Sequence, residues 1–188
     1  MNPKGKSIVL VGMMGAGKST VGSCLQRRTN FPLFDIDGIV ASKFEIPISE
    51  IFSTYGETRF REAETSVLRE ISRAKQAIIV TGGGIVLRRE NVEILKQLGV
   101  VVWLDGDEGT LFKRAMKSGN RPLLRGKNPR QAFAQMLKQR LPVYARTADL
   151  RINTSALTDE EVALAILTKL KQSSRSRGPG APIQATAS

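Results

Sequence analysis

The sequence predicts a single α/β domain in which a parallel sheet of five strands lies between two layers of helices. Short apolar segments rich in β-branched residues alternate with longer segments whose apolar residues recur at helical spacing. A glycine-rich sequence, residues 12–19, follows the first apolar segment and precedes the first helical one. The length of 188 residues suits one domain with one core.

The predicted strands fall into two groups. Continuous apolar runs are typical of strands buried on both faces of a parallel sheet, and they occupy residues 7–11, 77–81 and 100–104. Two weaker segments, residues 31–35 and 150–153, complete the five strands.

The helical segments between these strands have apolar residues on one face. They are residues 18–28, 57–73, 89–98, 108–117 and 129–144. A last helix over 158–171 starts at Thr158, with Glu161 at the spacing of a capping box. From Ser173 onward the composition changes to serine, arginine, glycine, proline and small polar residues, which offer too little apolar surface to offset the entropy of ordering. We therefore expect a folded domain over 1–172 and a disordered tail over 173–188.

The composition excludes several kinds of site and partner. The chain has no histidine and a single cysteine, Cys24, so an internal disulfide, a multi-cysteine zinc site and a histidine base are all excluded. The formal charge of +12 favours anionic partners, but the basic residues are scattered and aromatics make up only 5%, which disfavours nucleic acid. With no signal-peptide pattern at the start and no apolar run near 20 residues, we expect a cytoplasmic protein that does not bind membranes. We also expect it to be a monomer.

The glycine-rich sequence fits the P-loop pattern G-x-x-x-x-G-K-[ST] in its required context between a strand and a helix. Its glycines let backbone N–H groups and the helix N-terminus converge on phosphate oxygens. Lys18 is expected to reach the β- and γ-phosphates of ATP, and Ser19 to place its hydroxyl on Mg²⁺. The predicted ATP-binding residues here are Gly12, Met13, Met14, Gly15, Ala16, Gly17, Lys18, Ser19 and Thr20. The motif predicts nucleoside triphosphate binding without identifying the phosphate acceptor.

Two aspartates, Asp35 and Asp37, follow the second predicted strand. Ligands of open α/β sheets bind at the carboxyl ends of the strands, which here places both residues beside the P-loop. On an extended segment, side chains two residues apart project to the same side, so both carboxylates are expected to face the ligand.

Taken together with the P-loop, five further motifs resemble those of shikimate kinases, in order and at similar spacing from about residue 7 to 171. They are the D-x-D of 35–37, the G-E-x-x-F-R-x-x-E-like segment 56–64, Gly82-Gly83-Gly84, Arg121-Pro122-Leu123-Leu124, and Arg140 with Tyr144. The resemblance implies an ATP-dependent, P-loop kinase fold that phosphorylates the 3-hydroxyl of shikimate. It also implies an acceptor-binding region at about 35–64 and a mobile lid at about 118–130.

The resemblance assigns roles to individual residues. Asp37 would contact the shikimate hydroxyls as the base, and Asp35 would approach the single Mg²⁺ through water. The carboxylate of shikimate would be held by Arg61 and Arg140, whose planar guanidinium groups suit two parallel hydrogen bonds. Glu64, one turn after Arg61, is placed to orient it. Gly82, Gly83 and Gly84 would contact the substrate. Arg121 would contact the transferring phosphate, and together with Asp37 and Lys18 it would form the set of catalytic residues. Arg114 would pack on the adenine ring of ATP.

The sequence departs from the family pattern near the acceptor region and leaves alternatives open. Ala41 replaces a usual glutamate, Val143 replaces a usual leucine, and the segment 44–46 (Phe-Glu-Ile) replaces a common threonine-glycine turn. One alternative is a kinase of another small polyol acid, such as gluconate. The other is a nucleotide-dependent switch or a nucleic-acid-binding module, although the chain contains no N-K-x-D sequence of the kind that GTPases use.

Overall fold

The computed structural model describes residues 6–117, 122–124 and 126–175 of the chain. Five strands form one sheet in the order β2-β3-β1-β4-β5, and every neighbouring pair is parallel. The strands are β1 (Ser7–Val11), β2 (Leu33–Asp35), β3 (Ile78–Val80), β4 (Gly99–Asp105) and β5 (Leu150–Asn153). The predicted five-stranded parallel sheet is therefore confirmed.

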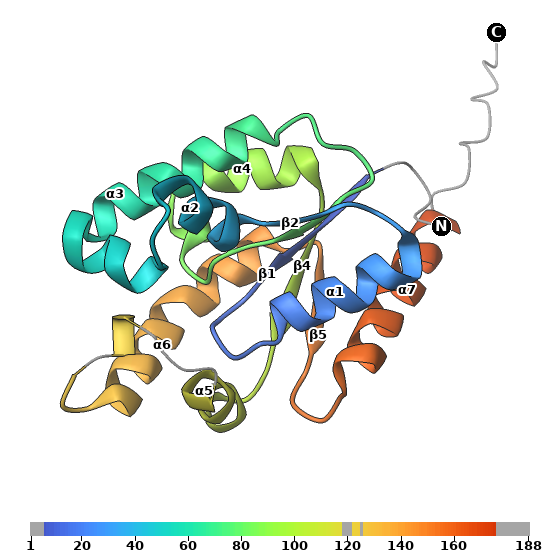
Figure 1. Ribbon diagram of the computed structural model, residues 1–188. Coiled ribbons are helices and arrows are strands. Elements are labelled where there is room, and N and C mark those ends of the chain that lie inside the picture. The colour runs from blue at the N-terminus through green and yellow to red at the C-terminus, as the bar shows by residue number, and fades with distance from the viewer. Residues whose placement is uncertain (1–5, 118–121, 125, 176–188) are drawn as a thin grey trace, which may run out of the picture.

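Helices cover both faces of this sheet (Figure 1). They are α1 (Lys18–Thr29), α2 (Ile36–Phe44), α3 (Ile48–Glu70), α4 (Arg89–Leu98), α5 (Glu108–Lys117), α6 (Pro129–Thr147) and α7 (Asp159–Arg175), with short 3₁₀ turns η1 (Ile85–Leu87) and η2 (Pro122–Leu124). Helices α1 and α7 pack against each other on one side, whereas α4 packs on α3, β1 and β4 on the other. All five residues of β1 are buried, as expected of the middle strand of a covered sheet.

The region after β2 differs from the sequence prediction. Asp35 ends the strand and at once caps α2, where its side chain accepts a hydrogen bond from the N–H of Gly38 at 3.4 Å. Asp37 therefore lies in the first turn of a helix, and the predicted extended geometry for the two aspartates is wrong. Helix α3 also begins nine residues earlier than the predicted 57, with a kink at Gly56 (φ 78°, ψ 169°) inside it.

The last helix begins as predicted and continues further than predicted. The hydroxyl of Thr158 accepts from the N–H of Glu161, and the carboxylate of Glu161 accepts from the N–H of Thr158, which confirms the capping box. The helix runs to Arg175, so Ser173 and Ser174 are helical. The rest of the predicted tail, 176–188, lies outside the described residues. Within the described part of the chain, no helix combines the length and apolarity needed to cross a membrane.

Glu45 ends α2 in the left-handed conformation, with φ 58° and ψ 19°. A side chain in this conformation brings Cβ close to the following carbonyl oxygen, a cost that glycine avoids. We expect Glu45→Gly to raise the free energy of unfolding by about 1 kcal/mol, measured by urea denaturation. As a control, Glu93→Gly in the helical part of α4 should lower it by about 1 kcal/mol. Equal destabilisation by both variants would contradict the conformational explanation.

Candidate active site

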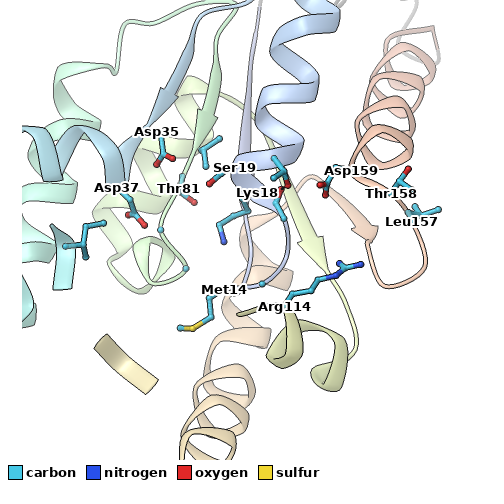
Figure 2. A pocket seen from close by; sticks show the side chains of 17 residues that line it. Met14, Lys18, Ser19, Asp35, Asp37, Thr81, Arg114, Leu157, Thr158 and Asp159 are labelled. Carbon is cyan, nitrogen blue, oxygen red and sulfur yellow. Dashed lines mark hydrogen bonds between the residues drawn. The ribbon is translucent and has the colours of Figure 1, made fainter. Parts of the chain in front are cut away.

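A cavity of about 790 Å³ opens at the carboxyl ends of the strands (Figure 2). Figure 2 shows Asp35 and Asp37 on one side of it and Leu157 and Asp159 on the other, with Lys18 between them. The segments that line it are the P-loop and the start of α1, the β2–α2 junction, the segment after β3, part of α5 and the loop between β5 and α7. This is the edge of the sheet where open α/β folds bind ligands.

The P-loop takes its shape from glycines that no other residue could replace. Gly15 has φ 84° and Gly12 has φ 144°, both outside the range that side chains readily adopt. A Cβ atom would lie 2.3 Å from the carbonyl oxygen of Leu104 at Gly12, and 2.1 Å from that of Leu111 at Gly15. The loop therefore packs directly on the backbone of β4 and α5, which fixes its position relative to the cavity.

The start of α1 is arranged to receive an anion. Its N-cap residue Gly17 provides no side-chain cap, and its first turn carries no acidic residue. The N–H groups at this end and the positive end of the helix dipole are thus open to phosphate. Lys18 donates to the carbonyl oxygens of Gly12 at 2.8 Å and Met13 at 3.0 Å, which holds its ammonium group along the loop.

Most of the predicted ATP-binding residues line the large cavity, whereas Gly12, Met13 and Ala16 do not, and Arg121 lies outside the described residues. Those lining the large cavity are Met14, Gly15, Gly17, Lys18, Ser19, Thr20 and Arg114. Met13 and Ala16 are only 1% exposed and belong to the core, so their side chains do not reach the cavity.

A second cavity of about 80 Å³ adjoins the first. Met14, Asp37, Ile48, Gly82 and Gly83 line both cavities. The smaller one is completed by Phe52, Phe60, Arg61, Gly84, Leu123 and Arg140. The structure therefore brings together all the predicted acceptor-binding residues, at the point where the small cavity meets the large one.

The two arginines of the small cavity have different partners. Arg61, on α3, pairs with Glu57 at 2.9 Å and with the buried Glu64 at 2.6 Å. Arg140, on α6, is 5% exposed and donates to the thioether sulfurs of Met13 and Met136, each at 3.8 Å. Sulfur is a weak hydrogen-bond acceptor, and no described carboxylate forms an ion pair with Arg140. The positive charge of Arg140 is therefore less compensated by protein groups than that of Arg61, and it is more available to bind an anion.

Acceptor-site side chains pack directly against the backbone of Gly82 and Gly84. A Cβ atom on Gly82 would lie 2.6 Å from Asp37 Oδ1 and 2.7 Å from Glu64 Oε1. A Cβ atom on Gly84 would lie 2.3 Å from Nη2 of Arg61. The glycine run therefore allows Asp37, Glu64 and Arg61 to gather at the end of β3.

Burial raises the pKa of Glu64 to about 7, against the lowering effect of Arg61 and with smaller raising effects from Asp37 and Glu57. Because the pKa is higher in the folded than in the unfolded state, the contribution of Glu64 to stability is full below its ordinary value of 4.5 and is lost as the pH rises through about 7. Glu64→Gln removes this titration. We therefore expect the variant to gain on the order of 3 kcal/mol relative to the wild type between pH 4.5 and pH 8, measured by urea denaturation. Glu62→Gln, at an exposed position on the same helix, should leave the pH dependence unchanged. A constant difference between wild type and Glu64→Gln across this range would contradict the prediction.

The far end of the large cavity is formed by residues to which the sequence analysis assigned no role in the site. Leu157, Thr158 and Asp159 line this end, whereas Thr81 lines the opposite side of the same cavity, beside Asp37 (Figure 2). Arg114 faces the same end and donates to the carbonyl oxygens of Thr154 and Ser155 at 3.1 and 3.4 Å. The only sequence feature that could have predicted them is their position after the carboxyl ends of β5 and β3, where ligands of open α/β sheets bind.

Part of the predicted lid is described. Arg121 lies outside the described residues, as do 118–120 and 125. The turn η2 packs on α6, and its Leu124 is 7% exposed while Leu123 reaches the small cavity. This part of the lid segment thus borders the acceptor side of the site.

The doubly wound fold, the P-loop and the two joined cavities define a P-loop kinase of small molecules. A family model for shikimate kinase matches residues 14–171. A shikimate kinase of Thermodesulfovibrio yellowstonii is 40% identical over 172 residues, covering 92% of this chain and 99% of that one. The structure of an Acinetobacter baumannii shikimate kinase in complex with shikimate has a TM-score of 0.87 at 36% identity, covering 91% of this chain and 96% of that one. The chain belongs to the shikimate kinase family.

A more distant structural neighbour bears on the gluconate alternative. A gluconokinase of Sinorhizobium meliloti shares 17% identity with a TM-score of 0.56, covering 92% of this chain and 95% of that one. At this identity the likeness extends to the fold alone.

Proposed function

We propose that this chain transfers the γ-phosphoryl group of ATP to the 3-hydroxyl of shikimate, giving shikimate 3-phosphate and ADP. The observation that carries the proposal is the junction of the two cavities. A triphosphate cradle opens there onto a small cavity that presents a carboxylate, Asp37, and two arginines, Arg61 and Arg140. A hydroxy acid is the class of acceptor that such a set fits, because the arginines suit a carboxylate and the aspartate suits a hydroxyl.

On the nucleotide side, the P-loop backbone and the N-terminus of α1 receive the phosphates, and Lys18 supplies the positive charge that the β- and γ-phosphates need. Arg114 and the loop 157–159 border the position left for the adenine ring at the far end of the cavity. Arg121 is assigned to the transferring phosphate on family resemblance.

On the acceptor side, Arg140 and Arg61 bind the carboxylate, and the run Gly82 to Gly84 lets the substrate approach the backbone closely. Asp37 accepts the proton of the 3-hydroxyl while that oxygen forms its bond to the γ-phosphorus and the bond to the β–γ bridging oxygen breaks. A loose transition state of this kind demands mainly positioning and charge stabilisation, which the rigid helix ends provide.

One Mg²⁺ per subunit completes the proposed site. Ser19 and Asp35 both line the large cavity, and a hydroxyl with one carboxylate through water suits a cation that draws most of its ligands from phosphates and water. No group of three or more acidic or cysteine side chains among the described residues could hold a metal ion on its own. When bound, the ion would neutralise charge between the β- and γ-oxygens.

The remaining parts of the proposal concern assembly and surroundings. We infer a monomer that acts in the cytoplasm, where ATP is available, and that does not require nucleic acid. The net charge of +12 then serves in part to attract two anionic substrates.

A coupled assay of ADP release tests the proposal, with shikimate, gluconate and no acceptor compared at equal ATP. Shikimate alone should give a rate above the control without acceptor. A rate with gluconate and none with shikimate would support the alternative kinase. Salt-dependent binding to DNA with no acceptor phosphorylation would support the nucleic-acid-binding alternative.

A further inference from the structure

We propose that Tyr144 is a positioning residue of the acceptor site, whose hydroxyl fixes the Gly83 peptide that lies against the Arg140 guanidinium. The inference rests on the proposed function and adds a residue that does not itself line either cavity. It concerns the affinity for the acceptor rather than the affinity for ATP.

The ring of Tyr144 is held rigidly inside the domain. Its side chain is fully buried, and the ring stacks on Trp103 of β4 with centroids 5.9 Å apart and planes at 27°. The guanidinium of Arg151 lies over Trp103 at 4.6 Å from the ring centroid and also pairs with Asp105. The phenol is thus fixed by packing that extends to the edge strand β5.

The hydroxyl of Tyr144 joins two parts of the acceptor site. It donates to the carbonyl oxygen of Gly83 at 2.5 Å. Burial raises the pKa of Tyr144 to about 12, and the positive charge of Arg140 opposes that rise. The phenol therefore keeps its proton at neutral pH and donates a hydrogen bond to Gly83, beside the guanidinium of Arg140. Arg140 and Tyr144 are four residues apart on α6, which places both on one face of the helix.

Holding the carbonyl of Gly83 also orients the next N–H group. The peptide between Gly83 and Gly84 is planar and trans, so the N–H of Gly84 must point away from the carbonyl that Tyr144 holds. Both glycines line the small cavity, whereas Tyr144 does not. Glycines have a wide choice of backbone angles, so an anchor outside the run is needed to keep this peptide in one orientation.

Gly83 is also the point where the two substrate sites touch. The position of a Cβ atom on Gly83 is 3.4 Å from Nη1 of Arg140, 3.4 Å from the carbonyl oxygen of Gly12 and 3.5 Å from the N–H nitrogen of Met14. A rotation of this peptide would move the acceptor-facing groups against the P-loop. Tyr144 therefore sets the position of the acceptor relative to the phosphate.

The test is Tyr144→Phe, which deletes one oxygen and keeps the ring. We expect the KM for shikimate to rise about tenfold, as one lost hydrogen bond implies, with the KM for ATP unchanged and kcat reduced less than the KM is raised. Thr147→Val is the matched control, since it removes another buried hydroxyl from α6 whose only described partner is the carbonyl oxygen of Val143. The control should lose stability without changing the KM for shikimate.

Two further measurements separate positioning from packing. In a double-mutant cycle, Tyr144→Phe and Arg140→Lys should raise the KM for shikimate by less than the product of their separate effects, because both disturb the contact between the Gly83 peptide and residue 140. If Tyr144→Phe does not fold, Trp103→Phe loosens the same ring while leaving the hydroxyl, and it should raise the same KM by a smaller factor.

An unchanged KM for shikimate in the folded variant, or an equal rise in the KM for ATP, overturns the inference. A wild-type enzyme with no activity on shikimate overturns the proposed function instead. The two failures are therefore distinguishable from the wild-type rate alone.

Discussion

We expect Asp37→Asn to lower kcat with shikimate by about 10²–10⁴-fold while leaving the affinity for ATP nearly unchanged. Asparagine has the size of aspartate but cannot take the proton of the acceptor hydroxyl at neutral pH. Asp37 lies in the first turn of α2 and lines both cavities, so its loss removes a group that acts at their junction. Single-turnover phosphorylation gives the chemical rate, and calorimetry gives the affinity for ATP.

Asp107→Asn is the matched control for this variant. Asp107 accepts from the N–H of Thr110 at 2.8 Å at the start of α5, lines neither cavity, and asparagine can make the same hydrogen bond. The control should keep full activity. A comparable loss of ATP affinity in Asp37→Asn would contradict the division of roles between the two cavities.

Lys18→Met should lower kcat/KM for ATP by about 10²–10³-fold, the loss typical of removing one charge-stabilising donor from a transition state. Methionine has a similar length but brings no charge to the β- and γ-phosphates. The hydrogen bonds that Lys18 makes to Gly12 and Met13 show that the ammonium group is held beside the loop, where a phosphate would meet it. Steady-state kinetics with ATP varied at saturating shikimate measure the effect.

The control for this variant is Lys169→Met on the exposed side of α7, which should leave the rate unchanged. Shikimate binding in the absence of ATP should survive Lys18→Met, because Lys18 does not line the small cavity. An equal loss of affinity for ATP and for shikimate would contradict this prediction, because it would indicate a misfolded P-loop rather than a missing charge.

The local parts of the fold were predictable. The buried strand Ser7–Val11, the edge strand Leu150–Asn153 and the helices Arg89–Leu98 and Glu108–Lys117 were predicted with their observed bounds, because hydrophobic periodicity and turn residues act over a few neighbours. The P-loop was predictable for the same reason, since its glycines and its flanking elements are contiguous. The resemblance to one family supplied the acceptor residues, which no local pattern indicates.

The parts that the sequence did not predict depend on contacts between distant segments. Helix α2 has a weak local pattern and owes its place to packing on α3, so Asp37 was predicted in an extended segment instead of a helix. The ion pairs of Arg61 join residues three and four positions apart on α3, so helical spacing accounts for them. By contrast, the contact of Arg140 with the thioether of Met13 and the position of the 157–159 loop arise from tertiary packing. No spacing rule along the chain contains that information.

The residues common to both cavities limit how this enzyme could change its specificity. Because Met14, Asp37, Ile48, Gly82 and Gly83 line both cavities, a substitution among them that changes the size of the side chain reshapes both substrate sites. A change confined to the acceptor must therefore use the outer wall, where Phe52, Phe60 and Leu123 border only the small cavity. If the family diverges toward a different hydroxy acid, we expect the first substitutions at those three positions, with the residues that line both cavities unchanged.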